Sequence, residues 1–263
     1  MRKELVMTYD FKDRVAIVTG AGGAMGAAIV KKFTDGGAKA VLIDIREAAA
    51  KKTAEKLGLD EEHGYCLAVD VSDADSVKNA IQKVADRFGR IDYLVNVAGI
   101  EGENNSRTED YDLKIAKKVF DINSFGTFLM MHFCLPVMQS QKFGAIVNFG
   151  SVSGMFGYAG EIAYGASKAA VIHMTKNAAN ENGGNGIRVN SVSPGWVKTE
   201  MFDRIIEQYK ETYENPMDNV TLGPMGRPAE PGEIANVVAF LCSEEAAFIN
   251  GANFLCDGGM TLG

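Results

Sequence analysis

The chain has 263 residues, a formal net charge of −7 and 46% hydrophobic residues, a composition that is typical of a globular protein with a sizeable core. The acidic balance and the lack of a basic stripe argue against a nucleic-acid binder. The scattered cysteines form no CxxC pair and the histidines form no ligand pattern, so we expect reduced thiols and no metal site. No apolar run reaches the ~18 residues of a membrane span, and we expect a cytoplasmic protein without a membrane partner.

Residues 1–11 form a short, mixed leader to which we assign no role. A largely apolar strand is expected over residues 14–19, as in a strand covered on both faces, and it runs into a glycine-rich turn and a helix over residues 27–35. In this context the turn and the helix N-terminus offer backbone N–H groups to a pyrophosphate. The residues of the turn that we expect at a dinucleotide are Gly20, Gly23, Met25 and Gly26.

The second strand, residues 40–44, ends in Asp44, 18 positions beyond Gly26. A carboxylate there is placed to accept hydrogen bonds from an adenosine ribose and to repel a 2′-phosphate. Arg46 follows soon after, but no basic residue stands in the turn itself. We therefore expect NAD rather than NADP, with Asp44 and Ile45 beside the ribose.

Alternating strands and helices continue through the middle of the chain. The expected elements are a helix over 47–57, a strand over 66–71, a helix over 74–88, a strand over 91–96 and a helix over 111–139. Asp70 can begin the turn that leads into the helix at 74. Asn123 lies inside the long helix, where asparagine is a poor helix former and needs a reason or is a plain surface residue.

A fifth strand over residues 145–149 precedes a loop that carries Ser151 and Ser153. A helix then begins near Ile162 and places Tyr164 and Lys168 four residues apart, on one face. A free phenol titrates near ~10, and a neighbouring cation favours the phenolate. The spacing therefore predicts a tyrosine base, although tyrosine and lysine also occur at this spacing in helices without any catalytic role.

After a sixth strand, residues 187–192, comes a Pro194-Gly195 turn. Residues 200–213 then show one apolar helical face between chain breakers. We expect residues 200–228 to cover the active site, and the alternative is plain core packing. A helix over 231–242 and a strand over 253–256 complete seven strands that alternate with helices. This order predicts one doubly wound parallel sheet over residues 12–263, Rossmann-like, with ligands at the carboxyl ends of the strands.

Taken together, these motifs resemble the short-chain dehydrogenase/reductase superfamily, and the resemblance runs from residue 12 to the end of the chain. Two positions depart from the family pattern. Ala24 stands where the phosphate turn usually has its middle glycine, and Val97 replaces the second asparagine of the motif after the fourth strand.

The resemblance implies roles for single residues. Ser151, Tyr164, Lys168 and Asn123 would be catalytic, with Ser151 on the substrate oxygen, Tyr164 as proton donor and acceptor, and Asn123 holding a water beyond Lys168. Besides Tyr164 and Lys168, the further cofactor residues that it implies are Asp70, Val71, Asn96, Ala98, Gly99, Pro194, Gly195, Val197 and Thr199.

The expected activity is NAD-dependent interconversion of a secondary alcohol and a ketone, in a homo-oligomer that the resemblance suggests is a tetramer. Apolar residues near Ser151 favour a bulky cyclic alcohol such as a hydroxysteroid; a sugar alcohol or an oxoacyl group is the alternative within the family, and a silent NAD-binding scaffold is the alternative outside enzymes. The residues that we expect at the substrate are Ser151, Ser153, Met155, Tyr158, Trp196, Met201 and Phe202, with Phe156, Ile205 and Ile206 nearby.

Overall fold

The computed structural model describes residues 9–103, 106–210, 214–215, 217 and 220–262. Over these residues, seven parallel strands form one sheet in the order β3-β2-β1-β4-β5-β6-β7. The strands are β1 (Val15–Thr19), β2 (Lys39–Asp44), β3 (Gly64–Ala68), β4 (Tyr93–Asn96), β5 (Gly144–Phe149), β6 (Ile187–Pro194) and β7 (Asn253–Cys256). The expected doubly wound parallel sheet is confirmed. The order reverses beside β1, which is where sheets of this kind bind ligands.

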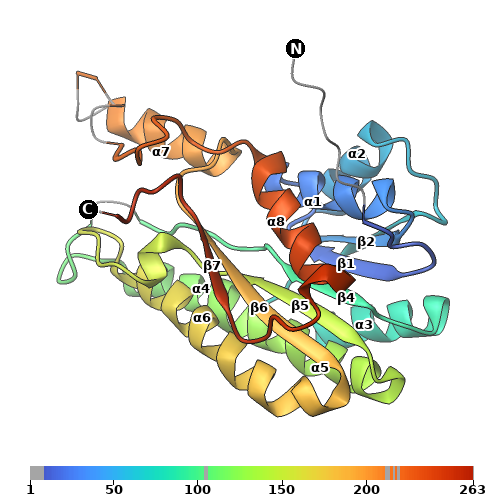
Figure 1. Cartoon of the computed structure of the whole chain (residues 1–263). Coiled ribbons are helices and arrows are strands. Elements are labelled where there is room, and N and C mark those ends of the chain that lie inside the picture. The colour runs from blue at the N-terminus through green and yellow to red at the C-terminus, as the bar shows by residue number, and fades with distance from the viewer. Residues whose placement is uncertain (1–8, 104–105, 211–213, 216, 218–219, 263) are drawn as a thin grey trace.

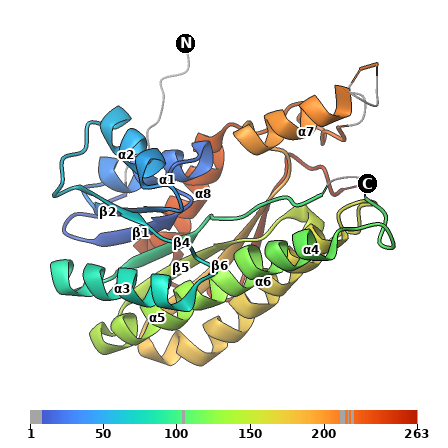
Figure 2. The same cartoon turned by 180° about the vertical axis from the view of Figure 1, so that it is seen from behind.

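Helices cover both faces of the sheet (Figures 1 and 2). The main helices are α1 (Ala24–Asp35), α2 (Glu47–Lys56), α3 (Ala74–Phe88), α4 (Leu113–Phe120), α5 (Gly126–Gln141), α6 (Ile162–Asn182), α7 (Glu200–Lys210) and α8 (Pro231–Cys242). Strand residues alternate between two cores because successive side chains of a strand point to opposite faces. In β1, Ala16 and Val18 pack with α1 and α8, while Val15 and Ile17 pack with α3 and α5.

Local sequence signals account for several element ends. Asp73 caps α3 by accepting a hydrogen bond from the Ser76 backbone N–H at 2.6 Å. Gly89 ends the same helix with φ of 69°, a left-handed conformation that suits glycine. Pro231 opens α8, and Glu230 and Glu233 form a reciprocal capping box around it. These ends lie close to where the sequence places them.

The third strand is shorter than expected and ends at Ala68, so Asp70 and Val71 lie beyond it. The Asp70 carboxylate accepts hydrogen bonds from the N–H and hydroxyl of Ser72, at 2.9 and 2.6 Å. This is the turn that aspartate commonly forms before a helix. Of the two roles considered for Asp70, the structure shows this one.

The long helix expected over 111–139 is interrupted. Between α4 and α5 the chain makes a π-helical turn, η1 (Asp121–Phe125), which contains Asn123. Such turns insert a residue into a helix and often mark functional positions. The Asn123 side chain is fully buried there and bonds outward to the loop at Ile100 and to Ser167 of α6. The interruption orients this one side chain, which answers why asparagine stands inside the helix.

The leader is partly structured. Residues 1–8 lie outside the described residues. Phe11, however, is buried and packs its ring against Phe33 of α1 and Tyr93 of β4, at centroid distances of 5.0 and 5.2 Å. The Phe11 N–H donates to the carbonyl of Gly36 at 2.8 Å. The core therefore begins earlier than the expected boundary at residue 12.

Helix α7 lies beyond the carboxyl ends of the strands, apart from the two helical layers (Figure 1). It runs from Glu200 to Lys210, and residues 211–213 of the expected helix lie outside the described residues. In the described part of the chain, none of the helices is long and apolar enough to span a membrane.

Candidate active site

A cavity of about 440 Å³ lies at the carboxyl ends of the central strands. Its walls come from the glycine turn, the segment after β4, the serine loop, the start of α6, the segment after β6, and α7. The expected site residues that line it are Gly20, Gly23, Met25, Gly26, Asp44, Ala98, Gly99, Ser151, Ser153, Tyr158, Tyr164, Lys168, Pro194, Gly195, Trp196, Val197, Thr199, Met201 and Phe202. Segments far apart in the sequence thus meet at one place.

Other expected site residues lie outside this lining, namely Ile45, Asp70, Val71, Asn96, Asn123 and Met155. Ile45 is exposed, and Asn96 is buried and donates to Asn148 at 2.9 Å. Met155 is also exposed, and its sulfur accepts a hydrogen bond from the Asn253 side chain. Phe156 and Ile206, which we expected near the substrate, are absent from the lining as well.

The glycine turn is shaped for close backbone approach. Gly20 has φ of 65°, which an L side chain rarely adopts. A side chain at Gly26 would collide with the Gly20 carbonyl, and at Gly22 a Cβ would lie 2.8 Å from the Asp44 carboxylate. Helix α1 begins at Ala24 and points its N-terminus into the cavity. Backbone N–H groups and the positive end of the helix dipole favour an anion there, so the turn fits the pyrophosphate of a dinucleotide.

Asp44 ties this turn to the next one. One carboxylate oxygen accepts from the Gly22 N–H at 3.0 Å and the other from the Arg46 N–H at 3.1 Å. The carboxylate still lines the cavity, as does Arg46. A carboxylate at the end of the second strand is the group that binds a ribose hydroxyl in this kind of fold.

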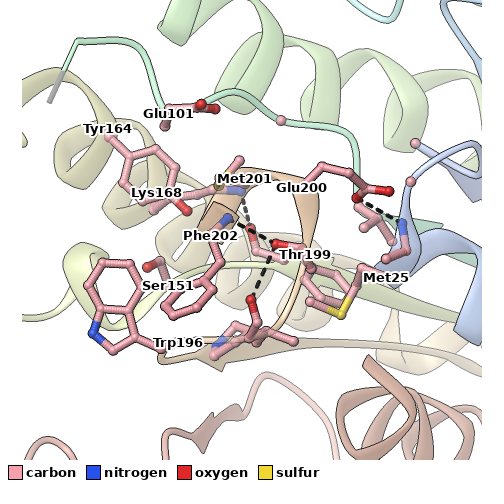
Figure 3. A pocket seen from close by; sticks show the side chains of 18 of the residues that line it. Met25, Glu101, Ser151, Tyr164, Lys168, Trp196, Thr199, Glu200, Met201 and Phe202 are labelled. Carbon is pink, nitrogen blue, oxygen red and sulfur yellow. Dashed lines mark hydrogen bonds between the residues drawn. The ribbon is translucent and has the colours of Figure 1, made fainter. Parts of the chain in front are cut away.

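The Ser151 and Tyr164 side chains lie close enough for the serine hydroxyl to lower the pKa of the phenol, against the larger effect of burial. Ser151 is buried on the loop after β5, and Tyr164 is in the first turn of α6 (Figure 3). The loop reaches the helix because Gly154 and Gly165 leave no side chain between them. A Cβ on Gly154 would lie 2.7 Å from the Lys168 carbonyl carbon, and one on Gly165 would lie 2.7 Å from the Ser153 carbonyl oxygen.

Lys168 lies one turn along the same helix. Its ammonium is buried, donates to the Phe149 carbonyl at 2.8 Å, and lies 5.8 Å from the centre of the Tyr164 ring. Burial lowers the pKa of Lys168 to about 8. It raises the pKa of Tyr164 to about 12, although the Ser151 hydrogen bond acts in the opposite direction. This differs from the expected lowering of the phenol pKa, because removal from water outweighs a cation at this distance.

Asn123 lies close to Lys168 without touching the cavity. Its side chain accepts from the Ile100 N–H and donates to the Ile100 carbonyl, both at 2.9 Å, and it also donates to the Ser167 hydroxyl at 3.0 Å. Gly99 separates it from the lysine, since a Cβ there would lie 3.2 Å from the Asn123 oxygen and 3.4 Å from the Lys168 nitrogen. The asparagine thus holds the loop after β4 against α6.

Helix α7 closes one side of the cavity with the apolar face that the sequence shows. Phe202 and Ile205 are buried and line the cavity, and Phe202 packs edge-on against Trp196 at 5.6 Å. Thr199 accepts a hydrogen bond from the Phe202 N–H at 3.3 Å (Figure 3). The helix therefore covers the cavity, and the same apolar residues are also packed against the protein, so both expectations for this segment apply.

Two acidic contacts join α7 to the rest of the site, and sequence reasoning did not identify them. Glu101, after β4, forms a bidentate ion pair with Arg204. The Arg204 Nε and Nη2 atoms donate to the two carboxylate oxygens at 2.9 and 3.1 Å. The Glu200 carboxylate accepts from the Ala24 N–H at 3.3 Å, at the N-terminus of α1 (Figure 3). The partners are 103 and 176 residues apart in the chain, so no local pattern could reveal them.

Glu161 is a further lining residue, and the sequence shows it only as a polar position on the loop. Burial raises the pKa of its carboxyl, while the neighbouring Ser153 side chain acts in the opposite direction. In the described part of the chain, the structure holds no cluster of three or more histidine, cysteine or acidic residues that could bind a metal.

Comparison with known proteins gives a consistent picture. The family model described as "Enoyl-(Acyl carrier protein) reductase" matches residues 20–261. Meso-2,3-butanediol dehydrogenase of Serratia marcescens is 37% identical over 251 residues, 95% of this chain and 96% of that protein.

Solved structures agree over most of their length. Levodione reductase superposes with a TM-score of 0.90 at 34% identity, covering 96% of this chain and 99% of its own. NAD⁺-bound xylitol dehydrogenase gives a TM-score of 0.87 at 32% identity, covering 95% and 99%.

Proposed function

The chain belongs to the short-chain dehydrogenase/reductase superfamily, and we propose that it is an NAD(H)-dependent enzyme that interconverts a compact secondary alcohol and its ketone. The observation that carries this proposal is that Ser151, Tyr164 and the buried Lys168 line one cavity together with the glycine turn. A silent scaffold would have no use for this arrangement.

In the proposed reaction, Ser151 and Tyr164 hold the substrate oxygen between them. The high pKa of Tyr164 keeps its proton on the phenol at neutral pH, so the residue is ready to donate to a ketone oxygen. Ser151 donates to the same oxygen and stabilises its developing charge. Lys168 keeps one N–H on Phe149 and directs the others to a ribose hydroxyl. The bound nicotinamide supplies the hydride chemistry.

The proton relay through Asn123 is also a proposal. Asn123 lies in η1, and both it and Lys168 adjoin Gly99, which lies between them. A water between Lys168 and the backbone of the π-helical turn would connect the lysine to solvent.

The preference for NAD over NADP rests on Asp44. Its carboxylate lies at the cavity and is held by two backbone N–H groups, so it cannot swing away from a 2′-phosphate without losing both. The same carboxylate weighs against an NADPH-dependent oxoacyl reductase. The solved relative described as NAD⁺-bound agrees with this choice.

The cavity supports a compact substrate. A volume of about 440 Å³ has to take the nicotinamide end of the cofactor as well as the alcohol. Met155, Phe156 and Ile206, which favoured a steroid in the sequence, are not in its lining. The named relatives act on butanediol, levodione and xylitol, all smaller than a steroid. Hydroxysteroid oxidation stays a prediction to be tested beside these.

A homo-oligomer is also proposed. Phe120, Phe125 and Phe128 are exposed along α4, η1 and α5, and Phe125 and Phe128 stack at 6.0 Å. An exposed aromatic patch of this kind is typical of an interface between subunits. The tetramer and the cytoplasmic location expected from the sequence stay predictions.

The proposed function is tested by steady-state kinetics with NAD⁺ and NADP⁺ against small secondary alcohols, sugar alcohols and hydroxysteroids. We expect NADH formation with the compact alcohols and a higher kcat/KM with NAD⁺. Asp44→Ala should narrow the difference between cofactors by about tenfold, the size of one charged hydrogen bond. Equal or better kcat/KM with NADP⁺ would refute the ribose assignment, and no turnover with any alcohol would refute the activity.

A further inference from the structure

Glu161 has a carboxylate oxygen, Oε2, that is buried without a hydrogen-bond partner. Three buried side-chain nitrogen or oxygen atoms in the described residues share this property, and two of them, Glu161 Oε2 and Trp196 Nε1, belong to residues that line the cavity. Buried polar atoms in proteins are nearly always paired. An unpaired acceptor in the wall of a substrate cavity is therefore a position at which a ligand group can complete the hydrogen bonding.

Glu161 stands beside the reacting pair in a parallel arrangement. Ser151 adjoins Tyr164, and Ser153 adjoins Glu161, since each serine lowers the pKa of its neighbour against the larger effect of burial. The two serines are two residues apart on one loop, and the two partners are three apart at the start of α6, where side chains are neighbours. Gly165 lets the loop pack directly on the helix, so both pairs are held side by side.

Electrostatics confirms that the two pairs are close. The negative charge of Glu161 raises the pKa of Tyr164 and also that of Tyr158, which lines the same cavity. Among the described residues, none of the lysine, arginine or histidine side chains forms an ion pair with Glu161. The side chain that acts on its pKa besides burial is a neutral hydroxyl, that of Ser153.

We propose that Glu161 binds a second hydroxyl group of the substrate, one or two carbons away from the carbinol held by Ser151 and Tyr164, and so makes the enzyme selective for diols and polyols. This rests on the proposed function. A diol donates its second hydroxyl to Oε2 and completes the hydrogen bonding of Glu161. A mono-alcohol leaves that oxygen unpaired, and sites built to bind a hydroxyl reject analogues that lack it.

A neutral hydroxyl suits this position better than an ammonium group. Burial raises the pKa of Glu161, which disfavours the full negative charge that an amine would need. The serine hydroxyl on the same carboxyl shows that a neutral donor is accepted there. The alternative to a diol is an amino alcohol, whose ammonium group would pair with a charged Glu161. The experiment below tests both substrate classes.

The experiment measures kcat/KM with NAD⁺ for matched pairs: 2,3-butanediol with 2-butanol, and 2,4-pentanediol with 2-pentanol. The ratio of diol to mono-alcohol is compared between the wild type, Glu161→Ala and the near-isosteric Glu161→Gln. Glu181→Gln is the matched control, because Glu181 is an exposed glutamate on the same helix. Circular dichroism melting of each variant shows that it is folded.

We expect the ratio to fall about 10- to 100-fold in Glu161→Ala and less in Glu161→Gln, which keeps an acceptor oxygen. Glu181→Gln should leave it unchanged. An unchanged ratio in a folded Glu161→Ala that still oxidises mono-alcohols would overturn the inference and leave the proposed function standing. A higher kcat/KM of the wild type for 1-amino-2-propanol than for 1,2-propanediol would also overturn the inference without affecting the proposed function. A wild type that oxidises none of these alcohols overturns the proposed function itself.

Discussion

Tyr164 is subject to two influences that shift its pKa in opposite directions. Burial raises it, and the hydrogen bond from Ser151 lowers it, with burial the larger effect. The phenol therefore keeps its proton over the whole neutral range. In the proposed reaction, this prepares the residue for donation in ketone reduction, and its use as a base in alcohol oxidation would require a change in its surroundings when cofactor and substrate bind.

Replacing Tyr164 by Phe removes the hydroxyl and keeps the ring. We expect kcat to fall by roughly 10²- to 10⁴-fold, as is usual for loss of a general acid. NADH affinity, measured by fluorescence titration, should change little. Tyr65→Phe is the control, since Tyr65 stacks on Arg87 away from the cavity. A Tyr164→Phe variant with near wild-type turnover would contradict the assignment.

Lys168 predicts a pH dependence of cofactor binding. Burial lowers its pKa to about 8, so it is charged below this value and neutral above it. A neutral amine holds a ribose hydroxyl less strongly than an ammonium. We therefore expect the Kd for NADH to rise several-fold between about pH 7 and about pH 9, centred near the lysine pKa.

Two variants test the source of that pH dependence. Lys168→Arg stays charged throughout this range and should remove it. Lys176→Met, an exposed lysine of the same helix, should leave it in place. A wild-type Kd that does not change with pH would show that Lys168 does not titrate there.

At this scale, the sequence predicted which residues would meet but not their titration. Tyr164 and Lys168 share a helix face through spacing alone, and the apolar strand before Ser151 brings the serine to the same edge of the sheet. The pKa values depend on burial, which α7 and the loop after β4 complete from distant parts of the chain. For the same reason, the unpaired oxygen of Glu161 could not be inferred from its neighbours in sequence.

Among the elements, α7 is the one whose position depends on polar contacts across the cavity. The Glu101–Arg204 pair joins it to the segment after β4, and the Glu101 side chain is only 14% exposed. Phe202 and Ile205 add apolar contact. Met201 of the same helix also lines the cavity, so these contacts contribute to how firmly the helix covers the site.

Arg204→Ala should loosen this cover with little loss of global stability, because a partly exposed ion pair contributes ~1 kcal/mol or less. We expect a several-fold rise in substrate KM and faster proteolytic cleavage within α7, at an unchanged melting temperature. Arg107→Ala, which breaks the exposed pair with Glu109, is the matched control. Equal proteolysis of both variants would show that the Glu101 contact does not hold the helix.

Element boundaries were predictable where a capping residue or glycine marks them, as with Asp73 and Gly89 around α3. The boundaries were not predictable where a side chain bonds to a residue far away in the sequence. The break at η1 exists because Asn123 bonds to Ile100 and Ser167, and a helical pattern contains no sign of either.

For the whole molecule, the exposed phenylalanines on α4, η1 and α5 predict association. Light scattering at micromolar concentration should give a mass above that of the 28.3 kDa chain. Phe125→Glu with Phe128→Glu should shift it towards the monomer, since a buried unpaired charge is costly. Lys83→Glu on the exposed side of α3 is the control. A monomeric wild type would refute this prediction.

The doubly wound parallel sheet was predictable because strands and helices alternate along the chain. The continuous apolar run of β1 indicates two covered faces, as found. The position of α7 was not predictable from the sequence, because its apolar face suits either a helix packed in the core or a helix that covers the active site. The ion pair of Arg204 with Glu101 and the hydrogen bond of Glu200 with the Ala24 N–H, both made with the first half of the chain, hold the helix at the cavity.

One of those contacts lies where a phosphate would bind. The Glu200 carboxylate accepts the Ala24 N–H at the start of α1, so an incoming pyrophosphate and this carboxylate compete for the same donor. The position of α7 and cofactor occupancy are then thermodynamically coupled, and such coupling is reciprocal. This coupling favours an ordered mechanism. The dinucleotide binds first and displaces Glu200 from the Ala24 N–H, so that α7 changes its position before the alcohol binds. Product-inhibition patterns that show random addition would be incompatible with that order.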